Sequence, residues 1–184
     1  MSSLPNIKVR LIVMNSLQFA IWGAYLISMG TYLFRVGLGD KIGYFYAMQG
    51  LVSLFMPALI GIVADRWIPA QKLLALCHLL SAFFRASLGY YGMTGGDASD
   101  FSSMHLLYSL AIAFYMPTLA LSNSVAYTAL EKEKLDPVSA FPSIRMYGTI
   151  GFICSMLATD ILGFQTNYMQ FFLSAGLGLI AATY

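Results

Sequence analysis

Charged residues are scarce in this sequence. Only 10% of the 184 residues are Asp, Glu, Lys or Arg, whereas soluble domains carry roughly 25%. Hydrophobic residues make up 59% and the mean hydropathy is +0.72, so a soluble core is excluded and a membrane protein is predicted. The net charge of +2, without a basic run, argues against a nucleic-acid partner.

Cysteine and histidine are also sparse, with two residues of each. Cys77 and Cys154 lie in apolar runs without a C-x-x-C partner, so both are predicted to be packing residues. His78 and His105 fall near opposite membrane surfaces, with no second ligand at metal spacing. No metal site is therefore expected.

Long apolar runs are what the sequence has in abundance. Six of them approach the ~20 residues that a spanning helix needs, at residues 11–34, 42–64, 73–91, 103–127, 143–162 and 166–184. We predict an all-α membrane protein, in which residues 1–184 form one six-helix transmembrane domain of two inverted three-helix repeats. The sixth run reaches the last residue without a flanking loop, so the chain is expected to be truncated in or after that helix.

The polar segments between these runs predict the loops and the orientation. Residues 130–137, "LEKEKLDP", are expected to be a cytoplasmic loop, and the Gly-rich residues 94–100 an external turn. Basic residues concentrate on cytoplasmic loops. With the N-terminus inside, the cytoplasmic segments hold Lys8, Arg10, Arg66, Lys72, Lys132 and Lys134, against Arg35 and Lys41 outside. A cytoplasmic N-terminus is therefore predicted.

Polar and aromatic residues recur at helical spacing within four of the runs, on faces that should avoid lipid. They are Asn15, Gln18, Trp22 and Tyr25; Tyr46, Gln49 and Ser53; Tyr108, Tyr115, Thr118 and Ser122; and Arg145, Thr149 and Phe152. Any one of them is explained by hydrogen bonding between helices. Together, the four faces predict a polar cavity near mid-membrane that solvates Arg145, with Gln18, Trp22, Gln49, Tyr115 and Ser122 as further candidate ligand contacts.

Two other features of the spans have structural interpretations. Arg85 lies about two turns from the outer end of its run, and its guanidinium is predicted to extend toward the membrane interface. Small residues at Ala20, Ala24 and Ser28, and at Gly148 and Gly151, predict close approach between helices.

One motif after the second run resembles a known family. "GIVADRW", residues 61–67, resembles the signature loop of the major facilitator superfamily, whose Asp and Arg latch the two halves of the transporter on the cytoplasmic side. Gly61, Asp65 and Arg66 match that loop. The second Gly and the basic pair that follow in the family are missing, and only Lys72 could substitute for them.

Within that superfamily, the chain is most similar to the nucleoside:H+ symporter family of bacterial inner membranes. The similarity rests on "LQFAIWGAYLISMGTYLF", "FMPALIGIVADRW", "FYMPTLALSNSVAY" and "FPSIRMYGTIGF". It implies the N-terminal half of a twelve-helix transporter, whose absent C-terminal half holds further ligand contacts and the proton-coupling acids. It also implies that Arg145 and Thr149 hydrogen-bond a nucleoside and Phe152 contacts its base. The proton is the coupling ion, and no cofactor is implied.

Other functions stay open at the level of sequence. A sugar or polyol symporter would carry similar polar faces, and a non-transporting membrane sensor could use the same fold. An intramembrane enzyme would need a paired nucleophile and base or a metal cluster, and none occurs at useful spacing.

Overall fold

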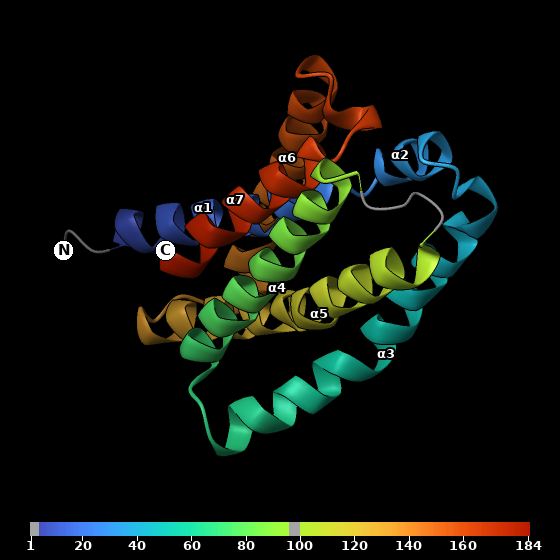
Figure 1. Cartoon of the computed structure of the whole chain (residues 1–184). Helices are drawn as coiled ribbons and strands as arrows, with labels where there is room; N and C mark the ends of the chain where they lie inside the picture. Colours follow the sequence, from blue (N-terminus) through green and yellow to red (C-terminus); the bar gives the residue numbers. More distant parts are fainter. Residues whose placement is uncertain (1–3, 96–99) are drawn as a thin grey trace.

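The computed structural model describes residues 4–95 and 100–184, and in this part of the chain all regular structure is helical (Figure 1). Residues 96–99 of the predicted external turn lie outside the described residues. The α-helices are α1 (Leu4–Gly23), α2 (Met29–Arg35), α3 (Ile42–Arg66), α4 (Ala70–Met93), α5 (Phe101–Lys132), α6 (Pro137–Ile161) and α7 (Met169–Thr183). Short 3-10 turns at Gly39–Lys41 and Phe164–Thr166 precede α3 and α7.

Helix α1 lies between two groups of helices. It packs against α6 on one side and against α7 and α5 on the other, while α4 packs against both α5 and α7. Helix α3 packs against α5 at the edge of the bundle (Figure 1). Phe45 is its only buried residue. The edge position of α3 leaves several of its large apolar side chains exposed, including Leu54 and Phe55.

Three helical segments of the described chain are long and apolar enough to cross a membrane. They are residues 39–66, α4 and α5. Helix α7 is apolar but has only 15 residues. These segments agree with the second, third and fourth predicted spans, and the count of six spans stays a prediction.

The predicted polar loop between the fourth and fifth runs is shorter than expected. Helix α5 continues to Lys132, and α6 begins at Pro137. The Asp136 carboxylate caps α6 by accepting hydrogen bonds from the backbone N–H groups of Val138 and Ser139, both at 3.1 Å. The hydrogen bonds from Ser139 and Val138 favour the charged form and lower the pKa of Asp136. A Pro at the first helical position needs no backbone N–H, so this start is locally encoded.

The prediction of one continuous first helix over residues 11–34 is wrong. The chain leaves the helix after Gly23 and re-enters it at Met29. Hydroxyl groups from neighbouring helices donate to carbonyls in this break: Thr159 Oγ1 of α6 to Ala24 O at 3.0 Å, and Tyr46 Oη of α3 to Leu26 O at 2.8 Å. A broken helix is tolerated within a membrane when neighbouring side chains satisfy its freed backbone groups.

Glycines bring α1 and α6 into main-chain contact. A Cβ at Gly151 would overlap the carbonyl of Ser16, and a Cβ at Gly23 would overlap the carbonyl of Phe152. Ser16 Oγ also donates to Tyr147 O at 3.2 Å across the same contact. The predicted close approach at Gly151 is confirmed, and its partner is α1.

The two cysteines differ in their surroundings. Cys77 is buried beside Leu73 and Leu74, as predicted for a packing residue. Cys154 is exposed on the outer face of α6, so the same prediction for it is wrong. Hydropathy places a residue within an apolar helix, but it does not say which face of that helix has a partner.

Candidate functional site

The open edge between α1 and α6 holds Arg145, the charged residue on which the predicted site depends. Arg145 is half-buried, and its guanidinium carbon lies 3.7 Å from the centre of the Phe19 ring on α1. Such a stacked cation gains ~0.5–2 kcal/mol, depending on how far it is removed from water. Phe19 therefore holds the guanidinium at this edge, where its N–H groups can reach a ligand.

Phe152 and Trp22 form an aromatic wall along the same edge. Their rings meet edge to face, with centroids 6.4 Å apart and an interplanar angle of 90°. Thr149 lies on α6 between Arg145 and Phe152 and is exposed. The edge thus combines a planar array of donors, a hydroxyl group and aromatic surface, which together suit a polar molecule that carries a flat ring.

Three of the other candidate contacts are sealed inside the bundle behind Trp22. Tyr115 Oη donates to Gln18 O at 2.5 Å, and Gln18 Nε2 donates to Thr118 Oγ1 at 2.6 Å. Ser122 is 1% exposed and donates to Leu119 O within its own helix. Gln18 Oε1 and Trp22 Nε1 are buried without a hydrogen-bond partner among the described residues.

Gln49 lies elsewhere, on α3. Its Oε1 accepts a hydrogen bond from Tyr108 Oη at 3.0 Å, and its side chain is half-buried. Tyr46, one turn earlier, donates to the break between α1 and α2. The predicted polar face of α3 is therefore used to hold α3 against α5 and against the broken first span.

The three residues of the signature motif lie near the end of α3. Asp65 and Arg66 are exposed there, and Gly61 has open space around it. No ion pair is seen between Asp65 and Arg66 in the described part of the chain, whereas Lys41 pairs with Asp40 at 3.2 Å. Both side chains are available to a partner outside the described chain.

The structure contradicts the prediction that the Arg85 side chain extends toward the membrane interface. That side chain is 2% exposed, so the guanidinium does not reach the membrane interface. The guanidinium carbon lies 5.0 Å from the ring centre of Tyr25 and 4.6 Å from that of Tyr115. Arg85 lies near the outer end of α4, but its side chain points into the bundle. Hydropathy alone does not show in which direction a side chain points.

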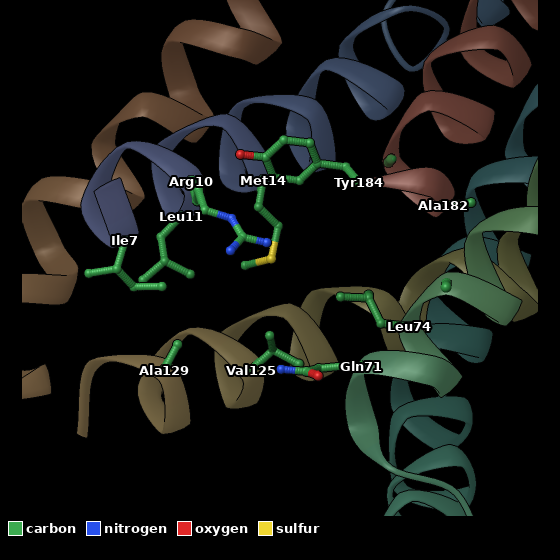
Figure 2. Close-up of a pocket in the computed structure, with 12 residues that line it drawn as sticks. Ile7, Arg10, Leu11, Met14, Gln71, Leu74, Val125, Ala129, Ala182 and Tyr184 are labelled. Atoms are coloured by element: carbon green, nitrogen blue, oxygen red, sulfur yellow. The ribbon is translucent and has the colours of Figure 1, made fainter. Parts of the chain in front are cut away.

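A pocket of about 320 Å³ lies between α1, α4, α5 and α7, away from the Arg145 edge. Figure 2 shows Ile7, Leu11 and Met14 of α1 facing Val125 and Ala129 of α5 across it. Arg10 and Gln71 supply polar groups, and none of the predicted site residues lines the pocket. The described residues also hold no group of three or more His, Cys, Asp or Glu side chains placed to bind a metal ion.

Phe19 is the site residue that the sequence reasoning missed. It lies in the quoted segment "LQFAIWG" and precedes Trp22 by three positions, which puts both rings on one face of α1. This spacing could have singled it out. Its contact with Arg145 joins residues far apart in the sequence, and only the fold reveals that contact.

Comparison with known proteins identifies the family. Residues 5–184 match the model of the nucleoside H+ symporter family. The xanthosine permease of Escherichia coli (strain K12) is 36% identical over 181 residues, which cover 97% of this chain and 42% of that protein. The nucleoside permease NupG of the same organism is 38% identical over 180 residues, covering 95% and 41%. The chain belongs to the nucleoside H+ symporter family, within the major facilitator superfamily.

Solved structures agree with this assignment. A crystal structure of a point mutant of the nucleoside transporter NupG superposes with a TM-score of 0.88 at 36% identity, covering 96% of this chain and 43% of that one. A second NupG crystal structure gives a TM-score of 0.85 at 37% identity. The chain spans about two fifths of the length of the relatives that it matches.

Proposed function

We propose that this chain is the N-terminal half of a twelve-helix, proton-coupled nucleoside importer of the bacterial inner membrane. In this proposal α1 and α2 together make the first of six spans, and the N-terminus is cytoplasmic, as the distribution of basic residues favours. The observation that carries the proposal is the Arg145 guanidinium, stacked on Phe19 at an open edge beside the Phe152–Trp22 wall.

The groups at this edge suit the chemistry of a nucleoside. Arg145 and Thr149 would hydrogen-bond the ligand, and Phe152 would contact the base, as an aromatic face suits a nucleobase. Trp22 packs edge to face against Phe152 and supports its ring. Gln18, Gln49 and Tyr115 would shape the site from behind, since their hydrogen bonds hold α1, α3 and α5 in place. Ser122, buried on α5, would line the same region.

The C-terminal half is the proposed partner. It would cover the open edge and the exposed face of α3, placing the nucleoside between two halves that rock to give alternating access. It would also supply the coupling acid, because the proton is the proposed coupling ion and no cofactor is involved. Gly61, Asp65 and Arg66 would form the cytoplasmic latch between the halves, and the protein would have no enzymatic activity.

Uptake of labelled uridine tests this proposal. The full-length transporter is reconstituted in vesicles and assayed with and without an inward proton gradient, with Arg145→Ala as the site variant and Arg10→Ala as the matched control. We expect gradient-stimulated uptake that Arg145→Ala abolishes and Arg10→Ala retains. Uptake that does not respond to the gradient would disprove proton coupling, and uptake of a hexose instead of uridine would disprove the substrate class.

A further inference from the structure

The most unusual group in the bundle is the guanidinium of Arg85. The side chain is 2% exposed, and its guanidinium carbon lies 5.0 Å from the ring centre of Tyr25 and 4.6 Å from that of Tyr115. Both Nη1 and Nη2 are buried and have no hydrogen-bond partner among the described residues. Among the described residues, two aromatic rings lie beside the charge, and no carboxylate or carbonyl accepts a hydrogen bond from Nη1 or Nη2.

Such an arrangement is costly for the fold. A buried charge without hydrogen bonds loses its hydration, and the attraction of ring faces recovers only part of that loss. Replacing buried ionic groups by apolar residues of similar size is often neutral or stabilising. An unbranched apolar side chain such as Met would fill this place at lower cost, so stability alone does not account for an arginine here.

The two rings that contact Arg85 lie against or just after α1. Tyr115 donates its hydroxyl to Gln18 O at 2.5 Å, and its ring lies 6.3 Å from that of Trp22. Trp22 in turn meets Phe152 edge to face at 6.4 Å. Tyr25 lies in the break that ends α1. A continuous series of contacts therefore joins Arg85 to Tyr115, Tyr115 to Trp22, and Trp22 to Phe152.

We propose that Arg85 is a positioning residue for the nucleoside site, which holds Trp22 and the end of α1 in register with α6. This inference rests on the proposed function, because the wall that it positions is the proposed contact for the base. Arg85 itself touches no ligand. The cation fixes the two tyrosine rings, and Tyr115 fixes Trp22 by ring contact and Gln18 by its hydrogen bond.

The test uses the full-length transporter labelled with 5-fluorotryptophan, in which Trp22→Phe assigns the fluorine resonance of Trp22. Three variants are compared with the wild type: Arg85→Met, Arg85→Lys and the matched control Arg10→Met. For each, the Trp22 resonance, the melting temperature and the affinity for uridine by calorimetry are measured.

We expect Arg85→Met to melt no lower than the wild type, to shift the Trp22 resonance and to bind uridine about tenfold more weakly, within the range for coupled neighbours. Arg85→Lys keeps a cation over the rings and should return the resonance and the affinity toward wild type. Arg10→Met should change neither quantity.

Two results would overturn the inference. An unshifted Trp22 resonance with native uridine affinity in folded Arg85→Met would show that Arg85 does not position the wall. A clearly lower melting temperature of Arg85→Met would show that Arg85 serves to stabilise the fold. If the wild type bound no nucleoside, the proposed function would fail, and the Trp22 resonance would still decide whether Arg85 positions this ring.

Discussion

The two sides of α1 are built differently. Toward α6, bare main chains touch at Gly23 and Gly151, and the edge beside them leaves Arg145 half-buried and Thr149 exposed. Toward α5 and α7, α1 is sealed by hydroxyl and amide hydrogen bonds, such as Ser174 Oγ to Ile21 O at 2.7 Å and Gln18 Nε2 to Thr118 Oγ1 at 2.6 Å. The α6 side is therefore expected to govern ligand affinity, while the sealed side governs the shape and position of α1.

The largest effect is expected at the main-chain contact of the α6 side. In Gly151→Ala the new Cβ would overlap the carbonyl of Ser16, and neither backbone can yield without moving its helix. Overpacking of this kind costs ~1–3 kcal/mol, and more where backbone is involved. We expect the full-length variant to show a marked fall in melting temperature.

The matched control for that contact is Gly176→Ala on α7, where nothing lies near the added Cβ. Since Ala is favoured over Gly inside helices by ~0.5–1 kcal/mol, this variant should melt at or slightly above the wild-type temperature. Equal melting temperatures for both variants would mean that α1 and α6 separate easily, and the two sides of α1 would then not differ as described.

The next largest effect concerns Arg145. Arg145→Lys keeps the charge but loses the planar array of donors and the flat stack on Phe19. Losing a hydrogen bond from a charged donor costs ~1.5–3 kcal/mol, or about ten- to a hundredfold in affinity. Calorimetry with uridine on the folded full-length variant measures this loss. Native affinity would make Arg145 a structural residue and remove the α6 side from ligand binding.

How much of this comparison could be read from the sequence depends on the distance between the residues involved. The second, third and fourth apolar runs and the family resemblance are local patterns, and the structure or the family comparison supports them. The cap at Asp136 is also local, although the sequence analysis did not predict it. The break after Gly23 is different, because Thr159 and Tyr46, which donate into it, lie far along the chain. No local pattern in "AIWGAYLISMG" marks that break.

Local sequence patterns also did not predict in which direction the charged side chains point. Arg85 and Arg145 both lie in apolar runs, and hydropathy treats them alike. Arg85 lies on the helix face that also carries His78 and Ser81, which are buried with it, and this spacing could have indicated an inward orientation. The pairing of Arg145 with Phe19 needed the packing of α1 against α6, which only the three-dimensional structure supplies.

A smaller effect is expected on the sealed side, at Tyr115. Tyr115→Phe removes the hydroxyl that donates to Gln18 O at 2.5 Å but keeps the ring against Arg85 and Trp22. A neutral hydrogen bond contributes ~0.5–1.5 kcal/mol. We expect a modest fall in melting temperature and a uridine affinity within a few-fold of wild type. A folded variant that had lost binding altogether would place Tyr115 in direct contact with the ligand.

The smallest effect is expected at the pocket on the sealed side of α1. Ala129 lies on α5 and lines this pocket of about 320 Å³, opposite Leu11 and Met14 (Figure 2). Ala129→Leu adds apolar volume that the pocket can take up, and cavity filling of this kind commonly stabilises by ~0.5–2 kcal/mol. Part of that gain is offset by the side-chain freedom that Leu loses on burial, ~0.5–1 kcal/mol.

The melting temperature of the full-length protein should therefore rise slightly in Ala129→Leu. Its uridine affinity should be unchanged, because the pocket contains none of the site residues. If Ala129→Leu weakened uridine binding, the pocket would be coupled to the α6 side.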